Sequence, residues 1–259
     1  MIPYPFTTAP AKDFPQDPPF YFSNFGFWKN HTSYPEASRA MAEEVGKKAG
    51  LDKNSILLEI GSGLGGSLFV WNRNFGTEHI TSINLPGEQS DFAKQNLQKW
   101  NLTSVHWIDG DWKSIKEFES ESFTQIICLD CIYHFANKDD FFAEVFRCLK
   151  PGGKFIFTDI VFPKEISKFS IQYKFLEFLV KMALIPKENH SSLDRTVIQI
   201  LKSKLKFKEF EEWGEFVFPG FSVFAKSQST GLQMFASTLL HFYKAGMLNY
   251  YLFSVEKPN

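Results

Sequence analysis

The sequence lacks the features that mark secreted, membrane-spanning and nucleic-acid-binding proteins. No uncharged apolar run reaches the roughly 18 residues that a membrane-spanning helix needs. The first 19 residues are rich in proline and aspartate and contain neither the basic nor the apolar region of a signal peptide. The formal net charge is −1, which gives no overall attraction to nucleic acid. We therefore expect a cytoplasmic location, no transmembrane segment and no nucleic-acid partner.

Cysteine is scarce as well. The chain has three, Cys128, Cys131 and Cys148, and an odd number without a signal peptide argues for a reducing compartment. Cys128 and Cys131 form a C-x-x-C pair, but no second cysteine pair completes the ligand set of a zinc site. We expect no metal.

Phenylalanine, in contrast, is abundant, with 30 copies in 259 residues, and apolar residues make up 44% of the chain. This length and composition allow a large core in one domain, with or without a cap. Most of the phenylalanines are needed for that core. Some can line a pocket for an apolar or cationic molecule, because aromatic faces attract cations.

The middle of the chain alternates between short apolar runs and helical patterns. Strands are predicted at 56–60, 80–84, 105–108, 123–129 and 154–159, and helices at 65–74, 87–100 and 138–149, after an earlier helix from Pro35 to Gly50. Alternation at this spacing indicates right-handed βαβ units and a parallel sheet. Pro151, Gly152 and Gly153 predict a turn before the fifth strand.

Beyond Asp159 the alternation stops. Residues 164–204 have a helical pattern, and 168–185 form an amphipathic helix with a wide apolar face. Strand-like segments follow at about 207–218 and 249–256, with a helix at about 230–245 between them. We divide the chain into an N-terminal segment with a cap helix (1–50), an α/β core (51–163), a helical cap insertion (164–204) and C-terminal strands and helix that complete the core (205–259).

The glycine-rich turn after the first strand carries the strongest functional signal. Residues 59–66 read Glu-Ile-Gly-Ser-Gly-Leu-Gly-Gly. A strand, a glycine turn and a helix form the arrangement that cradles nucleotides in open α/β sheets. Gly61, Gly63 and Gly66 fit the dinucleotide pattern G-x-G-x-x-G. Glu59 with Gly61, Gly63 and Gly65 equally fits E-x-G-x-G-x-G.

The second pattern resembles motif I of class I S-adenosylmethionine (SAM) methyltransferases. Further segments in the expected order strengthen that resemblance, which runs from about Phe20 to Pro258: 82–89 (SINLPGEQ), 109–112 (DGDW), 129–135 (LDCIYHF) and 149–159 (LKPGGKFIFTD). The chain looks most like the small-molecule group that includes sterol, tocopherol and phosphoethanolamine methyltransferases. The segment 24–28 (NFGFW) is similar to an N-terminal motif of that group. The resemblance implies a doubly wound, mostly parallel seven-stranded α/β sheet with a helical cap.

The resemblance also implies a set of cofactor-binding residues. Asp111 would accept a hydrogen bond from the adenine amino group, and the backbone N–H of Trp112 would bind a ring nitrogen. Glu59 would act toward the SAM amino group or through neighbouring hydrogen bonds. The second strand ends in Asn84, where a nicotinamide site and many SAM sites have an acid. Asn84 with Gln89 is similar to the variant of the sterol and tocopherol group.

Residues of the expected acceptor pocket come from two segments. Asp130 and His134 follow the fourth strand, where open sheets place reacting groups, and His134 can accept a proton near neutral pH. A structural role for His134 stays open as well, and Tyr133 either lines the pocket or packs in the core. Four residues are candidates for closing the site or contacting the substrate from the N-terminal side: Tyr21, Phe25, Trp28 and His31.

The function implied is transfer of a methyl group from SAM to O, N or C of a small, apolar molecule, with S-adenosylhomocysteine as product. Two alternatives stay open at this point, an NAD(P)-dependent oxidoreductase and a non-catalytic SAM-binding protein. A homodimer is left open as well.

Overall fold

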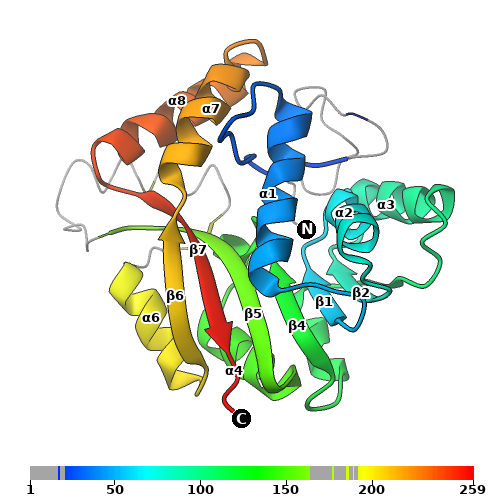
Figure 1. Ribbon diagram of the computed structural model, residues 1–259. Coiled ribbons are helices and arrows are strands. Elements are labelled where there is room, and N and C mark those ends of the chain that lie inside the picture. Colours follow the sequence, from blue (N-terminus) through cyan, green and yellow to red (C-terminus); the bar gives the residue numbers. More distant parts are fainter. Residues whose placement is uncertain (1–16, 18–20, 164–176, 178–184, 187–188, 190–191) are drawn as a thin grey trace.

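The computed structural model describes residues 17, 21–163, 177, 185–186, 189 and 192–259 (Figure 1). The helices are α1 (Tyr34–Ala49), α2 (Gly66–Phe75), α3 (Glu88–Lys99), α4 (Lys138–Cys148), α6 (Leu193–Lys202), α7 (Gly214–Ala225) and α8 (Thr230–Lys244), with short 3₁₀ helices η2 (Trp112–Glu117) and η3 (Ile132–His134). The strands are β1 (Ile56–Ile60), β2 (His79–Asn84), β3 (His106–Asp109), β4 (Phe123–Cys128), β5 (Leu149–Val161), β6 (Lys206–Glu212) and β7 (Asn249–Glu256).

The seven strands form one sheet in the order β3-β2-β1-β4-β5-β7-β6. Strands β1 to β5 pair in parallel, and β7 runs antiparallel to both of its neighbours, β5 and β6. The chain moves from β1 outward to β2 and β3 and then returns to the other side of β1 with β4. The point between β1 and β4 is therefore the topological switch point, where open α/β sheets bind ligands. The predicted doubly wound, mostly parallel seven-stranded sheet is confirmed.

The sheet is buried on both faces because alternate residues of its central strands enter two different cores. Leu57, Ile127 and Ile156 pack with residues of α1, α2 and α3 on one face. Leu58, Ile126 and Phe155 pack with residues of α4 and α6 on the other. The second core is rich in phenylalanine rings, with Phe155 stacked on Phe157 and Phe157 on Phe253. Core packing thus accounts for part of the high phenylalanine content.

Helices α7 and α8 lie together beyond the carboxyl edge of the parallel strands, next to the upper end of α1 (Figure 1). The sequence pattern predicted a strand over 207–218, and this prediction was wrong in its second half. β6 ends at Glu212, and Gly214 begins α7, which continues through Pro219. The burial of Val217, Phe218 and Phe221, which pack with residues of α8, outweighs the local strand-like pattern.

One further difference concerns the strand that precedes the 164–204 insertion. β5 begins at Leu149 instead of 154, because Leu149 pairs with Phe123 and the N–H of Gly152 donates to the carbonyl of Lys257. The amphipathic helix predicted at 168–185 lies almost wholly outside the described residues. In the described end of that insertion, α6 packs against α4 and β6.

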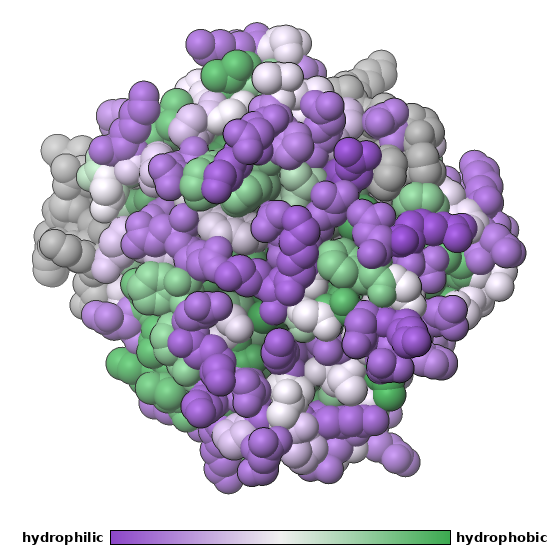
Figure 2. All heavy atoms as spheres, in the orientation of Figure 1, coloured by the Kyte–Doolittle hydropathy of each residue, from purple (hydrophilic) through white to green (hydrophobic). Residues whose placement is uncertain are grey.

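The surface is mixed in character (Figure 2). Apolar atoms gather over α6 and β6, where Ile198, Leu201 and Phe210 are exposed. Within the described ranges, no helix has the length and apolar character that crossing a bilayer requires.

Candidate functional site at the carboxyl edge of the sheet

The glycine turn connects β1 to α2 at the switch point. Gly61, Gly63 and Gly65 all have positive φ, at 85°, 53° and 82°, so the turn needs residues without a Cβ. The N–H of Gly61 donates to the carbonyl of Ile83 over 2.8 Å, which fixes the turn to the neighbouring strand β2. A Cβ on Gly61 would lie 2.7 Å from the Cβ of Cys131. The turn after β1 and the loop after β4 therefore touch.

Residues 21–33, which we call the N-terminal segment, cover the glycine turn. A Cβ on Gly66 would lie only 2.1 Å from the carbonyl oxygen of Tyr21, and one on Gly63 would lie 3.4 Å from the Oγ of Ser23. The ring of Tyr21 stacks on Trp100 and meets Phe92 edge to face. The glycines thus allow close approach of the chain itself as well as of a ligand.

Glu59 lies at the carboxyl end of β1 and is buried. The hydroxyl of Ser67, on α2, donates to its Oε1 over 2.7 Å, whereas Oε2 is buried with no hydrogen-bond partner among the described residues. Burial disfavours the charged form and raises the pKa of Glu59 to about 8. Such a carboxyl group is suited to pair with a donor that the protein itself does not provide.

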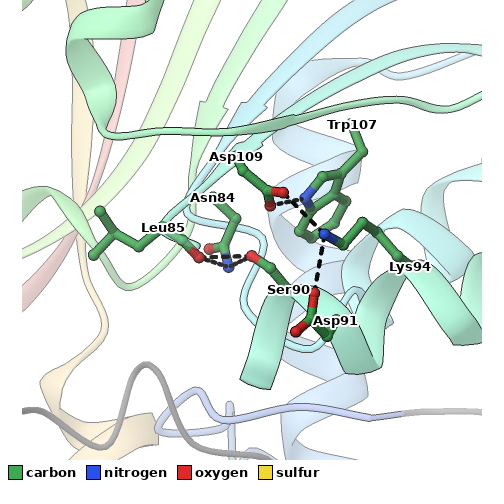
Figure 3. A network of polar contacts seen from close by, with 7 residues as sticks. All are labelled: Asn84, Leu85, Ser90, Asp91, Lys94, Trp107 and Asp109. Carbon is green, nitrogen blue, oxygen red and sulfur yellow. Dashed lines mark hydrogen bonds and ion pairs between the residues drawn. The ribbon is translucent and has the colours of Figure 1, made fainter. Parts of the chain in front are cut away.

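Asn84, at the end of β2, organises the glycine turn. Its Oδ1 accepts a hydrogen bond from the N–H of Gly63 over 3.0 Å. Its Nδ2 donates to the Oγ of Ser90 over 3.0 Å (Figure 3). Gln89 is buried in the first turn of α3, and its Oε1 lies 3.8 Å from where a Cβ on Gly63 would be. Both residues therefore lie beside the central glycine of the turn.

Two aspartates lie at the end of β3 and just after it, and their surroundings differ. Asp109 accepts hydrogen bonds from Lys94 and from the indole of Trp107, both over 2.9 Å, and the lysine lowers its pKa (Figure 3). Asp111 is exposed and caps η2 by accepting from the N–H of Lys113 over 2.8 Å. Trp112 is buried with its ring against Phe141. Asp111 therefore presents a partly used carboxylate at the carboxyl edge.

Asp130 is the centre of a polar cluster after β4. Its Oδ2 accepts from the N–H of Phe25 over 2.8 Å, and its Oδ1 accepts from the hydroxyls of Tyr133 and Tyr250 over 2.9 Å and 3.1 Å. Burial raises the pKa of Asp130 to about 6, against the opposing effect of these three hydrogen bonds. The carboxylate joins the N-terminal segment to β4 and β7.

His134 ends the short helix η3 and is partly buried, with its ring 4.4 Å from the ring of Tyr133. The structure therefore brings Asp130, Tyr133 and His134 together in one loop. His31 is placed differently. Its N–H donates to the carbonyl of Trp28, and its side chain lies near Glu36 at the start of α1.

Aromatic rings of the N-terminal segment pack against α7 and β7. Phe25 meets Phe221 edge to face at 4.9 Å and lies 6.1 Å from Tyr250. The N–H of Trp28 donates to the carbonyl of Phe216 over 2.7 Å, and its indole packs so close to Gly220 that a Cβ there would lie 2.2 Å away. The N-terminal segment and α7 thus form one cover over the carboxyl edge.

Sequence reasoning missed two residues that contact this site, Tyr250 and Asn189. Tyr250 reaches Asp130 from β7, and the buried Nδ2 of Asn189 donates to carbonyls of the loop that carries His134. Neither residue belongs to a recognisable motif. An asparagine between apolar segments gives no signal of a long-range contact.

Comparison with known proteins finds matches that include the α/β core. Residues 58–157 match a family model described as a methyltransferase domain. The chain is 26% identical over 142 residues to erythromycin 3''-O-methyltransferase of Saccharopolyspora erythraea, which covers 54% of this chain and 46% of that protein. It is 23% identical over 182 residues to sterol 24-C-methyltransferase of Saccharomyces cerevisiae, covering 70% and 46%. The chain thus spans about half the length of these curated relatives.

Among solved structures, the fold is similar to geranyl diphosphate C-methyltransferase of Streptomyces coelicolor in complex with Mg²⁺, geranyl diphosphate and S-adenosylhomocysteine. The TM-score is 0.79 at 16% sequence identity, with coverage of 97% of this chain and 94% of the other. At this identity the likeness establishes the fold.

Proposed function

We propose that this chain, whose residues 58–157 belong to the methyltransferase domain family, transfers the methyl group of SAM to O, N or C of a small, apolar acceptor. The resemblance to class I SAM methyltransferases predicted from the motifs is confirmed by the family match and by the named relatives. The identity of the acceptor and of the methylated atom belongs to the proposal.

The observation that carries the proposal is the contact between the two loops at the switch point. The glycine turn follows β1 and the loop with Asp130 and His134 follows β4, two adjacent parallel strands. Gly61 and Cys131 bring these loops into van der Waals contact. A donor molecule held by the first loop and an acceptor facing the second would therefore be neighbours, as direct group transfer requires.

The residues present fit SAM. The buried Oε2 of Glu59 offers an acceptor for the ammonium of the amino-acid part. The glycine turn lets the backbone approach the ligand closely, with Gly61, Gly63 and Gly65 on the cradle. Asn84 and Gln89 would hydrogen-bond to the ribose, and Asp111 and the N–H of Trp112 would hydrogen-bond to the adenine. Asn84 would also support the cofactor indirectly by fixing the glycine turn, because its amide already binds Gly63 and Ser90.

The acceptor pocket would lie between the Asp130 loop and the aromatic cover. Phe25, Trp28 and Tyr133 would supply its apolar surface, with Tyr21 over the glycine turn and His31 at the outer end of the same segment. Sterol and geranyl diphosphate, the names carried by two of the similar proteins, denote molecules with large apolar parts, which fits such a lining. Enclosure by aromatic rings would also exclude water from the transfer.

Bound SAM supplies a methyl group that a nucleophile attacks directly, so the protein chiefly has to align the acceptor with it. His134 would take the proton that a hydroxyl or protonated amine must lose. Asp130 already accepts three hydrogen bonds, so its role in catalysis would be to hold Phe25, Tyr133 and Tyr250 around the acceptor. His134 is thus the proposed base, and Asp130 would hold the residues that surround the acceptor in place.

Glu59 gives the proposal a pH signature. With a pKa of about 8, Glu59 is protonated below that pH in the absence of SAM, and pairing with an ammonium favours its ionised form. Binding then releases one proton, so the Kd for SAM should decrease about tenfold per pH unit as the pH rises from 5.5 to 7.5. Calorimetry across this range measures it. In Glu59→Gln the dependence should vanish, and the same slope in that variant would contradict the assignment.

The function itself is tested by calorimetry with SAM, S-adenosylhomocysteine and NAD, followed by a screen for methyl transfer to sterols, fatty acids, macrolides and small amines. We expect binding of SAM and S-adenosylhomocysteine and transfer to at least one apolar acceptor class. Binding of NAD without SAM would establish the oxidoreductase alternative. SAM binding with no transfer across the screen would favour a non-catalytic SAM-binding protein.

The proposal also covers the cellular location, the class of substrate and the oligomeric state of the protein. Free Cys128, Cys131 and Cys148 support a cytoplasmic location. A net charge of −1 supports a small-molecule substrate over nucleic acid. The exposed apolar residues of α6 and β6 provide a surface on which a homodimer could form, which light scattering would test.

A further inference from the structure

The loop after β4 needs hydrogen-bond donors from outside. Its helix η3 is a single turn, in which the N–H groups of His134 and Phe135 bond to the carbonyls of Cys131 and Ile132. Such a short helix leaves its last carbonyl groups without partners in the turn itself. Buried carbonyls must find donors elsewhere.

Asn189 supplies those donors. Its Nδ2 lies 2.8 Å from the carbonyl oxygen of Tyr133 and 2.7 Å from that of Phe135, the two residues on either side of His134. Both partners are pure acceptors, so the amide nitrogen must face them and both of its hydrogens are used. The side chain is 5% exposed, and the backbone N–H of Asn189 donates to the carbonyl of Pro186. Solvent therefore competes little with this clamp.

The clamp acts on the middle of a loop whose two ends are held by other contacts. The near end is held where the N–H of Asp130 donates to Thr158 over 2.8 Å. The far end is held where Lys138 pairs with Asp159 over 2.6 Å. Asn189 binds between them and fixes the peptide groups flanking His134. Loss of the clamp would leave the contacts at both ends in place and remove the two hydrogen bonds that hold the peptide groups flanking His134.

We propose that Asn189 is a positioning residue that holds His134 in its orientation toward the acceptor pocket. The assignment rests on the proposed function in which His134 is the base. Asn189 acts through the backbone of residues 133 and 135 and touches no reacting atom. A side chain contributed from beyond β5 thereby sets the geometry of a group that follows β4.

The primary test reads out His134 directly and needs no acceptor. The chain has six histidines, and the imidazole signals of His134 in an NMR spectrum of histidine-labelled protein are those absent from His134→Ala. In Asn189→Ala and in the isosteric Asn189→Asp, which lacks the two donors, we expect the His134 signals to shift or broaden while those of distant His79 stay in place. Asn72→Ala is the matched control, because Asn72 also donates from its amide to a backbone carbonyl, that of Thr77. It should leave the His134 signals unchanged.

The second test is a double-mutant cycle on turnover, with the acceptor found in the screen. Asn189→Ala should lower kcat about 10- to 100-fold, the usual effect of misplacing a catalytic group by roughly an ångström, and leave the Kd for SAM unchanged. In a His134→Ala background the same change should cost less than about twofold, because the group it positions is absent. Unchanged His134 signals in both Asn189 variants, or full additivity in the cycle, would overturn the proposal. Full turnover of His134→Ala alone would instead overturn the base assignment on which it rests.

Discussion

Replacing Lys138 by Met is expected to lower the free energy of unfolding by about 3–5 kcal/mol. Lys138 begins α4 and Asp159 lies near the end of β5, and their side chains are 2% and 1% exposed with Nζ and Oδ2 2.6 Å apart. Burial raises the pKa of Asp159, and the neighbouring ammonium counteracts that rise. Removal of the lysine leaves a carboxyl group in the interior without its counter-charge. Chemical denaturation of the wild type and the variant measures the difference.

Lys47→Met is the matched control for this experiment. Lys47 and Glu44 are also close, at 2.7 Å, but they are 59% and 36% exposed on α1. An exposed pair of this kind contributes at most about 1 kcal/mol. Replacing Lys138 and Asp159 together by Met and Leu should recover most of the lost stability, because the cost lies in the unpaired charge. Equal effects of the two single variants would show that burial does not set the strength of the Lys138 pair.

His134→Ala is expected to reduce turnover about 100- to 10,000-fold, the range over which a positioned general base contributes. The Kd for SAM should stay within about twofold, because the base acts on the acceptor in the transfer step. Steady-state kinetics and calorimetry on the same preparation separate the two quantities. The limb of the pH–rate profile that reports ionisation of the general base should also disappear.

His79→Ala serves as the control, because His79 is exposed at the start of β2, at the amino edge of the sheet. That variant should keep full turnover. If His134→Ala also keeps full turnover, alignment alone would drive the transfer and no base would be needed.

The parts of the fold that sequence predicts well are those whose signals are local. Each of the first four strands was placed within a residue or so, because its apolar run is bounded by turn residues. The glycine turn was located by the residues themselves, since positive φ at Gly61, Gly63 and Gly65 needs glycine. Helix α7 was missed because the aromatic and β-branched residues 216–218 favour a strand and Pro219 argues against a helix interior until the tertiary partners are known.

The candidate site divides in the same way. Glu59, Asn84 and Gln89 lie next to the glycine turn, as the motifs indicated. The contacts of Asp130 could not be anticipated, because Phe25 and Tyr250 are 105 and 120 residues away along the chain. Those distances are bridged only by the full sheet topology. No local pattern encodes them.

The position of β7 has a consequence for how the protein is made. β7 is the last strand in the sequence, yet it lies between β5 and β6 and pairs with both. During synthesis one edge of β5 therefore stays unpaired until residues 249–256 have left the ribosome. Until then β6 has no partner strand in the sheet. Tyr250 arrives at Asp130 at the same moment. A chain shortened before residue 249 would lose an interior strand of the sheet and not an edge strand. It would also lose Tyr250, which donates a hydrogen bond to Asp130. Such nascent or truncated chains would expose two unpaired strand edges, which makes them targets for chaperones and for aggregation.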